Sequence, residues 1–147
     1  VGLDVHQESI SVALIRPDHA ERQFREAIRL TRRPDRSEEE PLSDYGAFLF
    51  RQGRMEEALP LLEQAVQALP HSARAHTEVG RVLLHLGRRE AAAATLEEAV
   101  QLDPRSSTAR LLLGRTYLQL GRTEEGERQL RLGREAWKQH YGSSTAK

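Results

Sequence analysis

Apolar and small residues recur along most of this chain with the period of an α-helix, and polar residues fill the positions between them. In residues 89–102, for example, Ala92, Leu96 and Ala99 follow one another at helical spacing and therefore share one face. Similar stretches precede and follow this one. The pattern predicts six amphipathic helices, at residues 38–52, 55–68, 73–86, 89–102, 107–120 and 123–140.

The pattern also repeats every 34 residues. The aligned columns are Gly46, Gly80 and Gly114; Gly53, Gly87 and Gly121; Arg54, Arg88 and Arg122; Ala58, Ala92 and Gly126; Leu62, Leu96 and Leu130; Ala65, Ala99 and Gly133; and Pro70 and Pro104. A fixed period of this length is the signature of a solenoid. The columns therefore predict three copies of one unit, made of a helix, a short turn and a second helix.

The glycine and proline columns have physical roles in such a unit. Gly46 and its equivalents lie inside the first helix, where glycine costs about 1 kcal/mol relative to alanine, so we expect close packing of two helices to offset that cost. Gly53 and its equivalents end the first helix, where a left-handed residue is favoured. Pro70 and Pro104 cannot continue the second helix and are expected to stop it.

These columns resemble the tetratricopeptide repeat over about residues 39–136. The matching positions are Leu42, Tyr45, Gly46, Leu49, Ala58, Leu62, Ala65, Pro70, Val79, Gly80, Leu83, Ala92, Leu96, Ala99, Pro104, Leu113, Gly114, Tyr117 and Leu130. The resemblance implies an all-α fold, an α-α superhelix (solenoid) of about three 34-residue hairpins plus a partial N-terminal repeat. The sequence departs from the family at His76 and Arg110, where a bulky apolar residue is usual, and at Gly126 and Gly133.

The expected organisation begins with an atypical arm at residues 1–17 and the second helix of a partial repeat with its connection at residues 18–38. Ala20, Phe24, Ala27 and Leu30 give that helix its apolar face, and Ser37 with Glu40 offers a capping box for the helix that follows. Three repeats are then expected at residues 39–72, 73–106 and 107–141, and a disordered tail at residues 142–147.

The N-terminal arm has a different pattern, since residues 9–14 alternate like a β-strand. VGLDVHQESISVAL resembles the opening strand and hairpin of insertion-sequence transposases with a ribonuclease-H-like domain, in which the residue matching Asp4 is a catalytic metal ligand. Such a two-metal site needs several carboxylates from distant strands, and no further alternating segments follow. A metal-dependent nuclease remnant carrying Asp4 is therefore a remote alternative to a degenerate first helix, a short ordered arm or a fusion remnant.

Composition narrows the function further. The chain carries 22 basic and 22 acidic residues, and this balance argues against non-specific binding to nucleic acid. It has no cysteine, which excludes disulfides and thiolate chemistry, and no apolar run of about 20 residues that could cross a membrane. The cytoplasm is therefore the expected location. None of the six histidines has metal-ligand spacing, and no catalytic constellation is found, so we expect neither an enzyme nor a cofactor or metal site.

The resemblance implies that the first helices line a concave groove that binds a peptide or partner protein. Transferred residue by residue, its expected contacts are Arg51, Arg74, Thr77, Arg81, Leu84, His85, Arg115, Leu118 and Gln119, with Ala47, Phe50 and Leu111 beside them. Arg81 and Arg115 are equivalent and could hold carboxylates of an acidic or C-terminal peptide through bidentate contacts. Ordinary solvated surface is the alternative, because exposed ion pairs contribute only about 0–1 kcal/mol.

Two acidic positions make one specialised ligand less favourable. Tetratricopeptide domains that hold the C-terminal carboxylate of chaperones have asparagine where this chain has Asp44 and Glu78, whose charge would repel that carboxylate. The leading prediction is thus a general protein-interaction module, and the alternative is a structural spacer or self-associating segment of a larger protein.

The last helix suggests a second interaction. Leu130, Arg134, Trp137 and Tyr141 lie along one stripe, which either folds back as a cap or forms an exposed patch for weak self-association through Trp137 and Tyr141. Acidic residues prevail between Asp35 and Glu63 and basic residues between Arg105 and Lys138, so head-to-tail association is one hypothesis.

Overall fold

The computed structural model describes residues 17–31 and 41–142, which contain seven helices and no strand. The helices are α2 (Pro17–Thr31), α3 (Pro41–Arg51), α4 (Met55–Ala68), α5 (Ala73–His85), α6 (Arg89–Leu102), α7 (Ser107–Gln119) and α8 (Thr123–Tyr141). The expected all-α fold is confirmed, and α4 and α6 have the predicted bounds. The strand-like arm with Asp4, the capping box at Ser37 and Glu40, and residues 143–147 of the tail lie outside the described residues.

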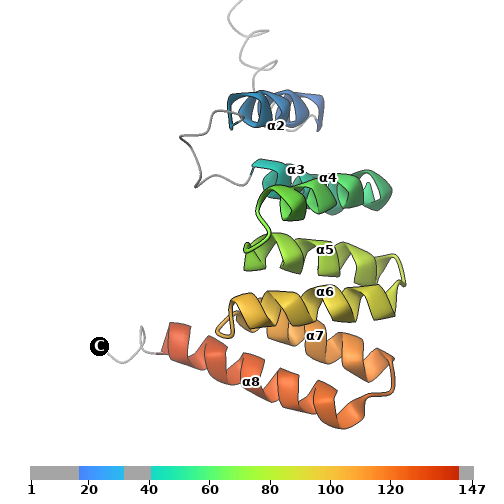
Figure 1. Ribbon diagram of the computed structural model, residues 1–147, viewed down its shortest axis with the longest axis vertical. Coiled ribbons are helices and arrows are strands. Elements are labelled where there is room, and N and C mark those ends of the chain that lie inside the picture. Colours follow the sequence, from blue (N-terminus) through green and yellow to red (C-terminus); the bar gives the residue numbers. More distant parts are fainter. Residues whose placement is uncertain (1–16, 32–40, 143–147) are drawn as a thin grey trace, which may run out of the picture.

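The helices stack in chain order as antiparallel hairpins, with α2 at one end and α8 at the other (Figure 1). Along the stack, α3 contacts α5 and α5 contacts α7, whereas the second helices α4, α6 and α8 make no contact with one another. Helices on the inside of a curved stack lie closer together than those on the outside. We therefore refer to α3, α5 and α7 as the inner layer.

Each first helix ends at the glycine that the repeat predicts. Gly53, Gly87 and Gly121 have φ angles of 77°, 75° and 77°, in the left-handed region that favours glycine. The residue after each glycine donates its backbone N–H five residues back, for example from Arg54 to the carbonyl of Leu49 at 2.9 Å. These bonds form Schellman-type ends that satisfy otherwise unpaired carbonyls of the helix.

Side-chain caps start the first helices of the second and third hairpins. The hydroxyls of Ser72 and Ser106 accept hydrogen bonds from the backbone N–H groups of Ala75 and Ala109, at 3.1 and 3.2 Å. α4 and α6 end two residues before Pro70 and Pro104, as expected from the missing proline N–H. α3 begins at Pro41, the first-turn position that proline favours.

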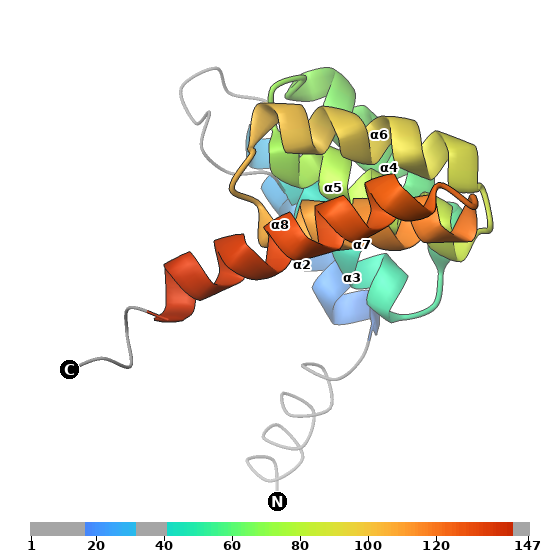
Figure 2. The ribbon, with the colours of Figure 1, turned by 90° about the horizontal axis from the view of Figure 1, so that it is seen from below.

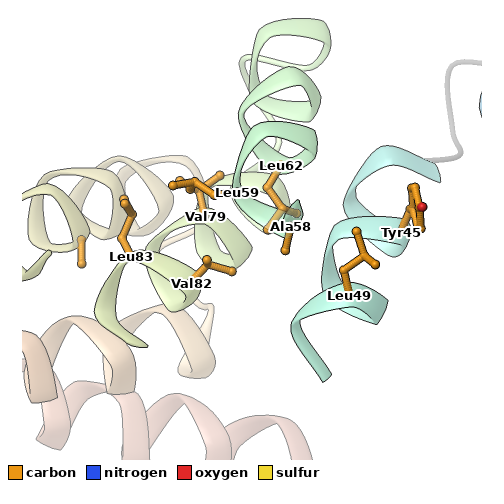
Figure 3. Packing of buried hydrophobic residues seen from close by; sticks show 9 residues of the cluster. Tyr45, Leu49, Ala58, Leu59, Leu62, Val79, Val82 and Leu83 are labelled. Carbon is orange, nitrogen blue, oxygen red and sulfur yellow. The ribbon is translucent and has the colours of Figure 1, made fainter. Parts of the chain in front are cut away.

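The core is built from leucines of the second helices that fill the space above glycines of the first helices. A Cβ added to Gly46 would lie 2.4 Å from Cγ of Leu62, and one added to Gly80 would lie 2.5 Å from Cγ of Leu96. Leu62 and Leu96 are fully buried. Figure 3 shows Leu62 beside the other labelled core side chains of α3, α4 and α5. The glycine column therefore has the packing role that the sequence predicts.

The third hairpin is packed more closely than the others. A Cβ on Gly114 would lie 2.9 Å from the carbonyl oxygen of Gly126, and a Cβ on Gly126 would lie 2.9 Å from that of Gly114. A Cβ on Gly133 would lie 3.1–3.2 Å from side-chain atoms of Leu111 and Arg110. The departure at Gly126 thus allows backbone contact between α7 and α8, and the departure at Gly133 makes room for side chains of α7.

α2 packs against α3 as the second helix of a preceding repeat would. The ring of Phe24 stacks on Tyr45, with centroids 5.4 Å apart, and lies 5.5 Å from the ring of Phe48. Glu21 forms an ion pair with Arg54, the residue that precedes α4. An aromatic contact and a charged contact therefore fix α2 on the stack.

His76 and Arg110, the two polar departures, bridge the helices of their own hairpins. His76 is 4% exposed, with Nδ1 2.9 Å from the carbonyl of Ser72 and Nε2 3.0 Å from a carboxylate oxygen of Glu98 on α6. Arg110 donates to the side chain of Gln129 on α8 at 2.8 Å. Both side chains replace apolar packing with a polar contact between the first and the second helix.

Candidate protein-binding face

The predicted groove residues form three rows across the inner layer. Each helix contributes residues at spacings of three and four, which places them on one face. The rows are Ala47, Arg81 and Arg115; Phe50, Leu84 and Leu118; and Arg51, His85 and Gln119. The inner layer thus brings residues from three repeats into one strip.

Two of the predicted arginines already have acidic partners. Arg74 on α5 forms an ion pair with Asp44 on α3, and Nη2 of Arg81 lies 3.5 Å from a carboxylate oxygen of Glu78 on the same helix. Nε of Arg81 is buried and has no hydrogen-bond partner in the described part of the chain. The carboxylates of Asp44 and Glu78 therefore offset much of the positive charge in the first two repeats.

Thr77 does not lie on the accessible surface. It is 5% exposed, and its hydroxyl donates to the carbonyl of Ala73 at 2.7 Å. Leu84 is half-buried and packs against the core cluster around Leu83. Helical spacing predicts a common face for these residues but not how deep each one lies, and Thr77 lies too deep to contact a ligand.

His85 and Arg51 lie at the ends of their helices. Nδ1 of His85 is 3.0 Å from the carbonyl of Arg81, and its ring meets the ring of Phe50 edge-on, with centroids 4.8 Å apart. Arg51 is exposed in the last turn of α3. Phe50 and His85 thus join the first and the second repeat along the inner layer.

The third repeat carries the most accessible part of the strip, which we call the third-repeat patch: Arg115, Leu118 and Gln119. Arg115 is exposed and forms no ion pair with any described residue. Leu118 is 39% exposed, and its side chain lies over Gly126. The side chain of Gln119 accepts a hydrogen bond from Nε of Arg89 at 3.2 Å. A guanidinium, an apolar side chain and an amide therefore stand side by side.

A polar cluster that the sequence did not reveal fixes the helix under this patch. The hydroxyl of Tyr117 donates to Glu97 on α6 at 2.6 Å, and the guanidinium of Arg122 lies 4.0 Å from the centre of the Tyr117 ring. Arg122 also pairs with Glu125 on α8. Burial and the bond to Glu97 raise the pKa of Tyr117 to about 12. The cluster links α6, α7 and α8 and so holds Arg115 and Leu118 in place.

Trp137 and Tyr141 lie near the end of α8. Trp137 is 53% exposed and Tyr141 50% exposed, and their ring centroids are 4.0 Å apart. The predicted cap would cover Trp137, but more than half of this side chain remains open to solvent.

The described residues lack the arrangements that a metal site or a membrane span would need. No group of three or more histidines, aspartates and glutamates in the described part of the chain is arranged to hold a metal ion. Among the described helices, none is both long and apolar enough to span a membrane.

Comparison with known families decides what kind of stack this is. One model, described as a tetratricopeptide repeat, matches residues 49–100 and 87–140, and a second model of the same description matches residues 12–73. The chain belongs to the tetratricopeptide-repeat family. The resemblance of residues 1–15 to a ribonuclease-H-like domain finds no support, because every matched segment is a tetratricopeptide repeat.

Solved tetratricopeptide structures share the fold at low identity. MamA of AMB-1 is 23% identical, with a TM-score of 0.65, and 81% of this chain aligns to 63% of it. A MamA RS-1 variant is 24% identical, with a TM-score of 0.67 and coverage of 80% and 64%. The second TPR of Spaghetti (RPAP3), bound to the HSP90 peptide SRMEEVD, is 22% identical, with a TM-score of 0.61 and coverage of 63% and 85%.

These likenesses show the fold of the chain, which spans less than two thirds of the MamA chains. No curated protein matches the sequence.

Proposed function

We propose that this chain is a protein-interaction module that binds an acidic peptide segment of a partner protein along the inner layer, with its main charged contact in the third repeat. The observation that carries the proposal is the third-repeat patch, where the guanidinium of Arg115, which has no ion-pair partner among the described residues, stands beside the exposed Leu118. A guanidinium can hold a carboxylate through two parallel hydrogen bonds, and a neighbouring apolar side chain adds buried area.

The charges of the first two repeats indicate the orientation in which the proposed peptide binds. Arg74 and Arg81 are offset by Asp44 and Glu78, so an anion gains less there than at Arg115. Phe50, Leu84 and His85 offer a mainly apolar surface in those repeats. The proposed ligand therefore places its acidic residues at the third repeat and its apolar residues toward the first.

Relatives make such a ligand reasonable. Both TPR domains of Spaghetti (RPAP3) have been solved with the HSP90 peptide SRMEEVD, a peptide rich in acidic residues. This likeness supports peptide binding as a use of the fold. Asp44 and Glu78 remain an argument against a ligand held by its C-terminal carboxylate in the first two repeats.

A peptide selection would test the proposal. A random peptide library is selected on the intact chain, and the dissociation constants of the enriched peptides are measured by calorimetry. We expect peptides that combine aspartate or glutamate with apolar residues. Arg115→Glu should weaken their binding about tenfold or more, because a favourable ion pair becomes a repulsion.

Arg128→Glu is the matched control, since Arg128 is an equally charged, exposed residue on α8. It should leave the dissociation constant within about twofold, while circular dichroism confirms that both variants fold. Failure to enrich any acidic peptide, or equal loss of binding in the two variants, would contradict the proposal.

A further inference from the structure

A pocket opens at the N-terminal end of the stack, between α2, α3 and α4. It has a volume of about 340 Å³, within the range of small-ligand pockets. We call it the N-terminal pocket; it is lined by Arg25, Leu42, Tyr45, Leu49, Glu57, Leu61 and Gln64. The leucines and the tyrosine are buried or half-buried, whereas the three polar residues are exposed. The pocket therefore has an apolar floor and a polar mouth.

The repeat explains why this space is open in the first hairpin. Leu42 is equivalent to His76 and Arg110, which bridge to Glu98 on α6 and Gln129 on α8. On α4, Gln64 is equivalent to Glu98 and Leu61 is equivalent to Gln129. Among the described residues, no polar contact joins either of them to Leu42. The side chain of Leu42 is also smaller than a large aromatic residue. Among the described residues, the first hairpin thus has an unfilled apolar space where the other two have a polar contact between their helices.

The opposite end of the stack offers a side chain that could fill such a space. α8 has 19 residues, against 14 in α4 and α6, and its C-terminal end projects beyond the other helices (Figure 2). On α8, Trp137 and Tyr141 follow Gly133 at intervals of four residues and therefore lie on the same face of the helix. Gly133 faces Leu111 near the beginning of α7, so this face of α8 extends beyond the first residues of α7. No helix of the described part of the chain covers the exposed halves of these two side chains.

The two ends also differ in charge. Residues 41–68 of the first hairpin carry four acidic and two basic residues, whereas residues 107–141 of the third carry seven basic and four acidic residues. Arg134 and Lys138 flank Trp137 on α8, and Glu56 and Glu63 are exposed on α4, the helix that forms one wall of the pocket. The charges therefore favour an approach of the third hairpin of one molecule to the first hairpin of another.

We propose that a second copy of this chain occupies the N-terminal pocket, by inserting Trp137 of its α8. The pocket and the end of α8 lie at opposite ends of the stack, so a molecule cannot fill its own pocket (Figure 1). The indole replaces water over Leu42 and Leu61, and Arg25 at the mouth is placed to cover the ring face. The contact is heterologous, so further copies can add in the same way.

Such a contact is small and should be weak. A single aromatic side chain with a charged rim buries less than the 1,200 Å² or so typical of stable interfaces. We therefore expect association at high micromolar concentration that high salt weakens, because the flanking charges are exposed.

Trp137 is the single tryptophan of the chain, so its fluorescence reports on the contact directly. Sedimentation velocity of the full chain should show a sedimentation coefficient that rises with concentration, while the emission of Trp137 shifts to shorter wavelength. Trp137→Ala should abolish the rise. Leu42→Trp, which fills the pocket from within, should also abolish it. Gln64→Trp blocks the exposed mouth in case Leu42→Trp does not fold.

A mixing experiment separates this contact from a symmetric α8–α8 dimer. The Trp137→Ala variant keeps an open pocket, and the Leu42→Trp variant keeps Trp137. Each alone should be monomeric, but a mixture of the two should form one-to-one dimers and nothing longer. A symmetric dimer would instead persist among the Leu42→Trp molecules, alone or in the mixture, and would not include the Trp137→Ala variant.

Two control variants define the site. Leu102 is 38% exposed outside both surfaces, so Leu102→Ala should leave association unchanged. Arg115 belongs to the face of the proposed function, so Arg115→Glu should weaken association by no more than about twofold, because the charge of a single exposed residue is largely screened by salt. The proposal is overturned if the intact chain stays monomeric at millimolar concentration, if folded pocket-filled variants associate normally, or if the mixture stays monomeric. A shift of Trp137 emission only with anionic lipid vesicles would assign the aromatic pair to a membrane surface instead.

Discussion

The second and third hairpins follow the same 34-residue register but are held together by different contacts. In the second hairpin, Gly80 makes room for the buried side chain of Leu96. In the third, Gly114 faces both the side chain of Leu130 and the backbone of Gly126. The register decides which positions meet, whereas the size of the residues decides how closely the helices approach.

The outer face of α8 also differs from the outer faces of α4 and α6. Leu59 and Ala93 are buried at equivalent positions of α4 and α6, and the next repeat packs over both helices. The equivalent residue of α8 is the exposed Glu127, and Val100 of α6 is replaced by the exposed Arg134. A polar outer face is typical of a capping helix in a solenoid. The third hairpin therefore combines the tightest helix pair with a surface suited to solvent.

The largest expected effect is on stability, and it should differ between Leu96 and Leu130, which occupy equivalent positions in the second and third hairpins. Leu96→Ala removes a fully buried side chain and should lower the free energy of unfolding by about 2–5 kcal/mol, because a cavity remains. Leu130 is half-buried, so Leu130→Ala should cost about 1–2 kcal/mol. Urea unfolding followed by circular dichroism measures both. Equal losses would mean that backbone contact does not replace leucine packing in the third hairpin.

The next effect concerns the glycine that departs from the repeat. Alanine occupies the register of Gly126 in both other hairpins, and helix propensity alone would make Gly126→Ala stabilising by about 1 kcal/mol. The added Cβ would lie 2.9 Å from the carbonyl oxygen of Gly114, so we expect a loss of about 1–3 kcal/mol instead. The same unfolding experiment decides, and a gain in stability would refute backbone contact between α7 and α8.

The smallest expected effect is the contribution of Tyr117 to stability, which changes only at high pH. The equivalent residue of the second hairpin is Leu83, which has no group that titrates. Folding raises the pKa of Tyr117 from about 10 to about 12, so the folded chain binds more protons than the unfolded chain between these values. The contribution of Tyr117 to stability is therefore complete below pH 10 and falls as the pH rises toward 12. Urea midpoints at pH 9 and 11 should differ more for the intact chain than for Tyr117→Phe. Equal differences would show that the phenol does not titrate in this way.

Much of the fold follows from the sequence, because helices need only local periodicity. The bounds of α4 and α6, the left-handed Gly53, Gly87 and Gly121, and the stops before Pro70 and Pro104 were all predicted from spacing. Within the described residues α3 begins at Pro41, and proline is favoured in the first turn of a helix.

The binding face was less predictable, because it depends on distances between repeats. Periodicity placed Thr77 on the inner face but could not show that it is 5% exposed. The ion pair of Asp44 with Arg74 joins residues 30 positions apart, and local periodicity does not predict it. The N-terminal pocket arises from a missing side-chain bridge, which only the three-dimensional comparison of the hairpins reveals.

The most direct test of the proposed function is a calorimetric titration of one selected acidic peptide into the intact chain, Arg115→Glu and Arg128→Glu. Binding to the intact chain and Arg128→Glu with equal affinity, and at least about tenfold weaker binding to Arg115→Glu, is the result that a third-repeat anion contact predicts. Equal affinity for all three chains would contradict it and would place the interaction surface elsewhere on the stack.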